Sequence, residues 1–180
     1  FGPLGGSDRV GLAAPADIAY AAVAMPGPSL ADPSAPALVL LGTQLSYGYL
    51  WNEVRVKGGA YGVRASLDGG RGSFNFSSYR DPNIERTLGI YLRAQGFVDN
   101  EMDLTPEGVE QAIIGTFKQL DVPMRPSSAV TAALGRHLSG ETEAFRRVFR
   151  TRLLSVESAA IPRAADAVFT AMGGVPVCAL

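Results

Sequence analysis

The first ordered pattern in the chain is a strand-like segment followed by a helix-like one. Residues 17–25 carry large apolar side chains among small residues and stop at the Pro-Gly-Pro of residues 26–28, which predicts a β-strand. Residues 37–56 are apolar on most sides and predict a long buried helix. This helix should end at Lys57, because cations favour the last turn and the glycine pair Gly58-Gly59 follows.

The next segment has the two-residue period of a β-hairpin. Residues 61–67 alternate, with Val63, Ala65 and Leu67 on one face. The glycine-rich run of residues 68–72 supplies the turn, and two phenylalanines alternate in the returning strand. The sequence therefore predicts two adjacent antiparallel strands directly after the helix.

Apolar side chains at three- and four-residue spacing dominate the remaining chain. Asp81-Pro82 and Thr105-Pro106 are typical helix starts, in which the first residue caps the helix and proline occupies the first turn. Ser139 is a further predicted cap. The expected helices cover residues 82–95, 105–120, 127–138, 139–156 and 161–172, and residues 175–179 predict a short final strand.

This order of elements indicates an α+β fold, in which an antiparallel sheet has its helices packed on one side. The 180 residues predict a single domain, or one lobe of a larger protein. Residues 1–9 are expected to be a disordered linker or an expression remnant in front of it. Residues 1–54 carry only five of the 33 charged side chains, so we expect the first third of the chain to supply central elements.

Composition and charge narrow the classes of function. Charged residues make up 18% of the chain, against roughly 25% in a typical soluble domain, so part of the surface is expected to be covered by a partner. A net charge of −1 argues against a nucleic-acid partner. One cysteine excludes an internal disulfide, and one cysteine with one histidine cannot form a Cys/His zinc site. His137 has no partner histidine and is interpreted as structural.

A membrane partner is not expected either. Residues 33–52 carry no formal charge and are long enough to span a bilayer. Thr43, Gln44, Ser46 and Asn52 interrupt this run, however, and no basic flank sets an orientation. A buried helix of a soluble fold fits the pattern better.

The most distinctive chemistry lies where the predicted helix turns into the hairpin. Arg55 falls at the helix end and Tyr61 at the start of the first hairpin strand, with Gly58 and Gly59 between them. Glycines permit a tight bend, so a guanidinium and a phenol can point into one space and donate hydrogen bonds to a peptide or an oxyanion. The simpler interpretation stays open: Arg55 and Lys57 complement the helix dipole while Tyr61 packs at a strand edge.

Three segments carry a resemblance to a known family. LWNEVRVKGGAYG, SSYRDPN and QAIIGTFKQLD resemble the carboxy-terminal lobe of the presequence proteases, which belong to the pitrilysin/insulinase family of zinc metallopeptidases. The similarity spans roughly residues 10–172 and is most specific from Leu50 to Asn83. It implies a two-layer LuxS/pitrilysin-like domain in an enzyme whose two halves close around a chamber. It also implies that zinc is held by an H-x-x-E-H motif in the missing amino-terminal lobe, since this chain contains no such motif.

The resemblance also assigns roles to residues. Tyr61 matches the family tyrosine that hydrogen-bonds the scissile carbonyl and the oxyanion, and Arg55 matches the arginine that orients the bound peptide. Ser77 and Ser78 are further candidates for the chamber wall. The implied partners are the amino-terminal catalytic lobe of the same polypeptide and unfolded peptide substrates, and the isolated chain should be inactive. The implied location is the cytoplasm in a bacterium or an organellar matrix in a eukaryote.

Two other classes of function remain open at this point. The same family includes proteolytically inactive subunits that act as scaffold or interaction modules, and such a copy need not keep the Arg55/Tyr61 pair. A free-standing ligand-binding α+β domain is a third interpretation. The low fraction of charged residues argues against a free-standing domain, because it indicates that part of the surface is covered by a partner.

Overall fold

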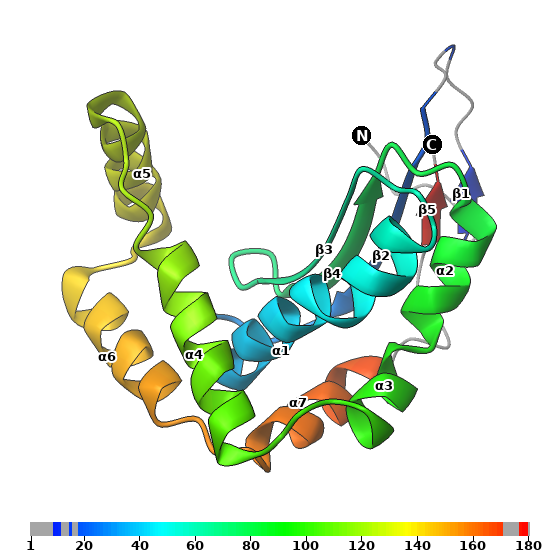
Figure 1. The fold of residues 1–180 in the computed structure, drawn as a ribbon. Coiled ribbons are helices and arrows are strands. Elements are labelled where there is room, and N and C mark those ends of the chain that lie inside the picture. Colours follow the sequence, from blue (N-terminus) through cyan, green and yellow to red (C-terminus); the bar gives the residue numbers. More distant parts are fainter. Residues whose placement is uncertain (1–8, 12–14, 16–17, 171–176, 180) are drawn as a thin grey trace.

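The computed structural model describes residues 9–11, 15, 18–170 and 177–179, and its centre is a five-stranded sheet (Figure 1). The strand order is β1-β5-β2-β4-β3, so that β3 forms one edge. Strands β5, β2, β4 and β3 pair antiparallel, whereas β1 pairs parallel with β5 at the other edge. The strands are β1 (Arg9–Gly11), β2 (Tyr20–Pro26), β3 (Gly62–Asp68), β4 (Ser73–Tyr79) and β5 (Val177–Ala179).

The helices cover one face of this sheet, which confirms the predicted α+β class (Figure 1). They follow the chain as α1 (Ala35–Tyr47), the π-helical segment η1 (Trp51–Val56), α2 (Ile84–Leu92), α3 (Ala94–Asn100), α4 (Pro106–Leu120), α5 (Pro126–Ser139), α6 (Glu143–Leu154) and α7 (Ala160–Phe169). None of the helices in the described ranges is long and apolar enough to span a membrane.

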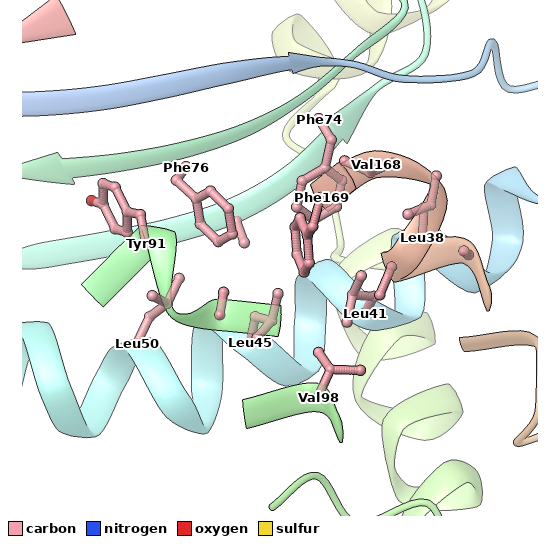
Figure 2. Close-up of a cluster of buried hydrophobic side chains, with 14 of the residues drawn as sticks. Leu38, Leu41, Leu45, Leu50, Phe74, Phe76, Tyr91, Val98, Val168 and Phe169 are labelled. Carbon is pink, nitrogen blue, oxygen red and sulfur yellow. The ribbon is translucent and has the colours of Figure 1, made fainter. Parts of the chain in front are cut away.

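The hydrophobic core lies between the sheet and α1. The leucines of α1 are almost fully buried on several sides of the helix, because the sheet lies on one side and other helices on the other. Aromatic side chains of β4 fill the other wall: Phe76 stacks on Tyr91 of α2, with ring centroids 5.0 Å apart, and also packs against Phe169 of α7 (Figure 2). The first third of the chain thus supplies central elements, as the charge distribution predicts.

The prediction of one helix over residues 37–56 is wrong in its second half. Helix α1 ends at Tyr47, and Gly48 leaves the helical region with φ −102° and ψ −92°. The chain then forms the wider η1 turn, in which the Lys57 N–H donates to the carbonyl oxygen of Asn52 at 2.9 Å. Such π-helical turns are rare and are frequent at functional sites.

Two of the predicted helix caps are also wrong. Asp81 does not cap a helix: its carboxylate accepts from the Asn83 N–H at 2.9 Å, and α2 begins only at Ile84. Ser139 belongs to the end of α5, which Gly140 terminates with φ +73°, and Thr142 caps α6 instead. A cap needs a particular backbone geometry as well as a suitable side chain, and the sequence shows only the latter. Thr105, by contrast, caps α4 as predicted and accepts from the Gly108 N–H at 3.1 Å.

Among the helices that the structure describes, α5 alone has no buried residue. It projects away from the sheet beyond α4 and α6 (Figure 1). Helix α6 is also shallow, since Leu153 is its only buried residue. The final strand is present over Val177–Ala179, whereas residues 175–176 lie outside the described ranges.

Candidate functional site

A tight turn joins η1 to β3 and sets the positions of Arg55 and Tyr61. The Gly59 N–H donates to the Arg55 carbonyl oxygen at 3.0 Å, and the Ala60 N–H donates to that of Val54 at 3.1 Å. Gly58 is buried so close to the Val54 carbonyl that a Cβ atom would collide with it, and Gly59 has φ +81°. Both glycines are therefore required by geometry, one for close approach and one for left-handed backbone.

Tyr61 leaves this turn with its side chain open to solvent. Its N–H is shared between the carbonyl oxygens of Tyr79 and Arg80, at 3.2 and 3.3 Å, which anchors its backbone to the end of β4. The phenol ring packs edge-on against the Tyr79 ring at 5.6 Å, yet 63% of the residue surface remains exposed. The hydroxyl is thus carried on a fixed base and is free to meet a ligand.

Arg80 lies beside both tyrosine rings. Its guanidinium carbon lies 5.7 Å from the Tyr61 ring centre and 5.6 Å from that of Tyr79, within the range of cation–π attraction. Among the described residues it is the only non-glycine with positive φ, at 50°. Such backbone conformations are costly and cluster at functional sites.

Arg55 lies on the other side of the turn and rests on Trp51. Its guanidinium carbon lies 3.9 Å from the indole centre, and the side chain is half-buried. Glu53, the acid of η1, pairs instead with Lys57 and Arg86. Within the described ranges Arg55 forms no ion pair, so its donors stay available, and they border a cavity of about 550 Å³.

The two candidate donors share one turn but have separate neighbours. Arg55 belongs to the cavity between α1, β3, α4 and α6, whereas Tyr61 stands at the end of the sheet with Tyr79. No hydrogen bond within the described residues joins them, so each would reach a ligand independently. Their use by a substrate stays a prediction.

The two serine candidates lie on opposite faces of β4. Ser77 is exposed on the face that the helices leave open, whereas Ser78 is only 4% exposed on the helix-covered face. The structure thus makes the Ser78 hydroxyl inaccessible to a bound peptide, because neighbouring strand residues point to opposite sides. Ser77 stays a candidate.

A resident metal does not fit the part of the chain that the structure describes. No group of three or more histidine, cysteine, aspartate or glutamate residues is placed to hold an ion there. His137 lies exposed in the last turn of α5, away from any such group. Among the described residues, the site offers the Tyr61 hydroxyl and the Arg55 and Arg80 guanidinium groups, and such donors can hydrogen-bond and polarise a carbonyl or carboxylate oxygen.

Trp51 and Arg80 were not recognised from the sequence. Trp51 precedes Arg55 by four residues, and this spacing brings side chains together on a helix, so it was a usable signal. Arg80 gave none, because its positive φ and its place between two tyrosines depend on how β3 and β4 pair.

Comparisons with known proteins agree on one family. The family model described as the PreP C-terminal domain matches residues 20–173. The mitochondrial presequence protease of Eremothecium gossypii is 36% identical over 133 residues, 74% of this chain and 13% of that protein. The mitochondrial presequence protease of Yarrowia lipolytica is 32% identical over 166 residues, 92% of this chain and 16% of that protein. The chain therefore spans less than a fifth of the length of these curated relatives.

The fold has solved counterparts as well. A peptidase M16 inactive domain from Pseudomonas fluorescens superposes with a TM-score of 0.66 at 16% identity, covering 95% of this chain and 41% of that one. At this identity the likeness concerns the fold alone.

Proposed function

The chain belongs to the PreP C-terminal domain family, and from this premise we propose that it is the zinc-free, substrate-binding lobe of a zinc metalloendopeptidase that degrades unfolded peptides. The metal and the cleavage chemistry belong to the amino-terminal lobe of the same polypeptide, and no step on this chain runs through zinc. Alone, the chain is inactive. Its contribution is to bind the peptide and to stabilise charge that develops during cleavage.

In this role Tyr61 donates a hydrogen bond from its hydroxyl to the scissile carbonyl oxygen. That oxygen gains negative charge when the carbonyl carbon becomes tetrahedral, so the same hydrogen bond strengthens in the transition state. The observation that carries the proposal is the exposed phenol on a rigid base: its backbone is pinned to Tyr79 and Arg80 while its hydroxyl end is free. A donor fixed in advance needs little reorganisation when the charge appears.

Arg55 binds the peptide a short distance away. Trp51 supports the guanidinium from one side, which leaves its N–H groups directed at whatever enters the cavity. Arginine donates through a planar fork that suits peptide carbonyl and carboxylate oxygens. We assign it to orientation of the bound chain and to the positive potential around it.

The test is Tyr61→Phe in the full-length protease. Because only the donor is lost, kcat/KM should fall by a factor of about 10² to 10³, while zinc content and folding remain those of the wild type. Tyr20→Phe is a matched control, since Tyr20 is also a partly exposed phenol on the open face of the sheet. An unchanged rate in Tyr61→Phe would return Tyr61 to a packing role.

The scaffold interpretation makes the opposite prediction. A purely structural copy needs neither an unpaired arginine supported by tryptophan nor an exposed phenol on a fixed base. If Tyr61→Phe and Arg55→Gln both left peptide cleavage unchanged while the parent protein stayed assembled, the scaffold role would be the better description of this domain.

A further inference from the structure

The cavity of about 550 Å³ along β3, which Arg55 also borders, is lined by many more cationic than acidic side chains. Five arginines line it and only one acid, Glu141, although the chain as a whole carries a net charge of −1. The arginines come from separate elements, so the charge is concentrated by folding. They are Arg55 of η1, Arg64 of β3, Arg136 of α5, and Arg146 and Arg150 of α6.

Most of this positive charge is not neutralised. Arg150 is held by Asp121 through two hydrogen bonds of 2.8 and 2.7 Å, which leaves it little capacity for a ligand. Arg64, Arg136 and Arg146 form no ion pair within the described residues. Cations gathered beside low-dielectric walls produce a strong local potential, and such a potential attracts carboxylates.

One wall of the cavity is the edge strand β3, and Ser46 of α1 occupies the middle of that edge. All residues from Gly62 to Leu67 line it, a run of about 20 Å at the usual rise of a strand. Strand β3 pairs only with β4, and the N–H of Ala65 points to the open edge, where the Ser46 hydroxyl accepts it at 2.8 Å. Val63 and Leu67, two positions away on each side, direct their main-chain groups to the same edge.

The opposite wall is apolar and comes from α6. Phe145 and Phe149 of that helix line the cavity, together with Leu120 at the end of α4. A cavity with an apolar wall, open main-chain groups and unpaired arginines matches an extended peptide that carries acidic side chains, because it offers a partner for each kind of group. The length of the strand edge favours a peptide over a small anion.

We propose that this cavity is a subsite for acidic residues of the peptide substrate. This inference rests on the proposed function and names a substrate feature that the Arg55/Tyr61 pair does not determine. A peptide whose scissile bond lies at Tyr61 continues along β3, since Tyr61 directly precedes the first strand residue that lines the cavity. Its carboxylates then meet Arg136 and Arg146.

The experiment compares two pairs of fluorogenic peptides with the full-length protease. The two peptides of a pair have equal length and differ only in carrying two Glu or two Gln residues; one pair carries them before the scissile bond and the other pair after it. For the pair whose Glu or Gln residues enter the cavity, wild-type kcat/KM at low salt should be about 5- to 10-fold higher for the Glu peptide, mainly through a lower KM. Added salt should reduce this preference, and this readout requires no variant.

The test variant is the double substitution Arg136→Gln with Arg146→Gln. It should abolish the preference for Glu, so that the Glu and Gln peptides are cleaved with equal kcat/KM. Arg147→Gln is the matched control, because Arg147 neighbours Arg146 on α6 but pairs with Glu143 and lies outside the cavity. Equal rates for Glu and Gln peptides on both sides in the wild type, or a preference that survives in the double variant, would overturn the proposal.

The same assay separates this inference from the proposed function. Tyr61→Phe should slow cleavage of the Glu and Gln peptides by the same factor and preserve the ratio between them. If Tyr61→Phe is inert, the proposed function fails. If Tyr61→Phe is slow but the wild type does not distinguish Glu from Gln, only the acidic subsite fails.

Discussion

At the scale of single residues, the turn between Arg55 and Tyr61 depends on two glycines for two different reasons. Gly59 needs left-handed backbone, whereas Gly58 needs space, since it lies against the Val54 carbonyl and the Arg86 guanidinium. Arg86 itself is fixed by a hydrogen bond to the Glu53 carbonyl oxygen at 2.6 Å. Neither neighbour can retreat freely, so the turn has little tolerance for a larger side chain.

We therefore expect Gly58→Ala to lower the free energy of unfolding by about 1–3 kcal/mol, because the added methyl group forces the turn apart. Urea unfolding of the chain measures this. Gly96→Ala is the matched control: no atom lies within 4 Å of the added Cβ in α3, so the same substitution should stabilise by about 0.5–1 kcal/mol. Equal stability of the two variants would contradict the role of close packing at Gly58.

The sequence shows some of these residue-level features and hides others. Gly58-Gly59 between an arginine and a tyrosine is visible in the sequence because glycine pairs mark tight turns. The buried state of Ser78 follows once β4 is in register, since it alternates with the phenylalanines, but the sequence alone left both Ser77 and Ser78 as candidates. The strained backbone of Arg80 has no local signal and arises from strand pairing.

At the scale of elements, α1 is attached to the edge strand β3 by close contact and by one side chain. Gly42 approaches so closely that a Cβ would lie 3.0 Å from the Ala65 carbonyl oxygen. The Ser46 hydroxyl donates to the Gly42 carbonyl oxygen at 2.6 Å and accepts from the Ala65 N–H at 2.8 Å. Ser46 thus occupies the middle of an otherwise open sheet edge and fixes the position of β3 against the core.

Ser46→Ala should therefore lower the free energy of unfolding by about 1–3 kcal/mol, because it leaves the Ala65 N–H buried without its acceptor. Ser128→Ala on exposed α5 controls for the loss of a serine hydroxyl and should change stability by less than about 0.5 kcal/mol. Chemical denaturation of both variants checks the difference. A Ser46→Ala protein as stable as the wild type would show that water or a neighbouring side chain replaces the hydroxyl.

A second link between elements predicts a pH dependence. Arg150 of α6 hydrogen-bonds Asp121 after α4, and this contact holds the pKa of the Asp121 carboxyl below its usual range. A lowered folded-state pKa means that the stabilisation is complete above the unfolded pKa of about 3.9 and is lost as the pH falls through the lower folded value. Asp121→Asn should therefore flatten the loss of stability below about pH 4.

Urea midpoints between about pH 5 and 2.5 measure this effect, and a double-mutant cycle isolates the pair. In an Arg150→Gln background, Asp121→Asn should no longer alter the slope of stability against pH. If the slope changes equally in both backgrounds, the pH effect belongs to other partners of Asp121.

Element prediction succeeded where local signals and packing agree. Thr105-Pro106 and the apolar period after it define α4 because the cap, the proline and the buried face all coincide. The prediction of one long helix over residues 37–56 fails after Tyr47, because the apolar pattern continues through Gly48 while the backbone changes to η1. A hydrophobic pattern does not report which backbone hydrogen bonds form, and in η1 the pattern continues although the α-helical hydrogen bonds do not and only Val54 is buried.

At the scale of the whole molecule, helix α5 stands out because none of its residues is buried in the described chain. Val130, Leu134 and Leu138 of α5 are 69%, 56% and 77% exposed, and their four-residue spacing places them on one side of the helix. Only 18% of all residues are charged, against roughly 25% in a typical soluble domain, which is consistent with a partly covered surface. In the proposed full-length protease we expect this apolar stripe to be covered.

The purified chain by itself should therefore self-associate through α5, because an apolar helix face gains free energy when it leaves water. Light scattering after size-exclusion chromatography should show a mass that rises with concentration. Leu134→Glu with Leu138→Glu should shift the chain toward the monomer. Helix folding should survive these substitutions, since neither side chain is buried in the monomer.

Ser128→Glu is the appropriate control, because it adds charge to α5 outside the stripe, about 120° around the helix from Leu134. It should leave the concentration dependence as it is in the wild type. If both changes dissociate the assembly equally, general charge repulsion is the cause. If neither does, contact must occur elsewhere, and the open face of the sheet around Tyr20 and Tyr79 becomes the surface to substitute next.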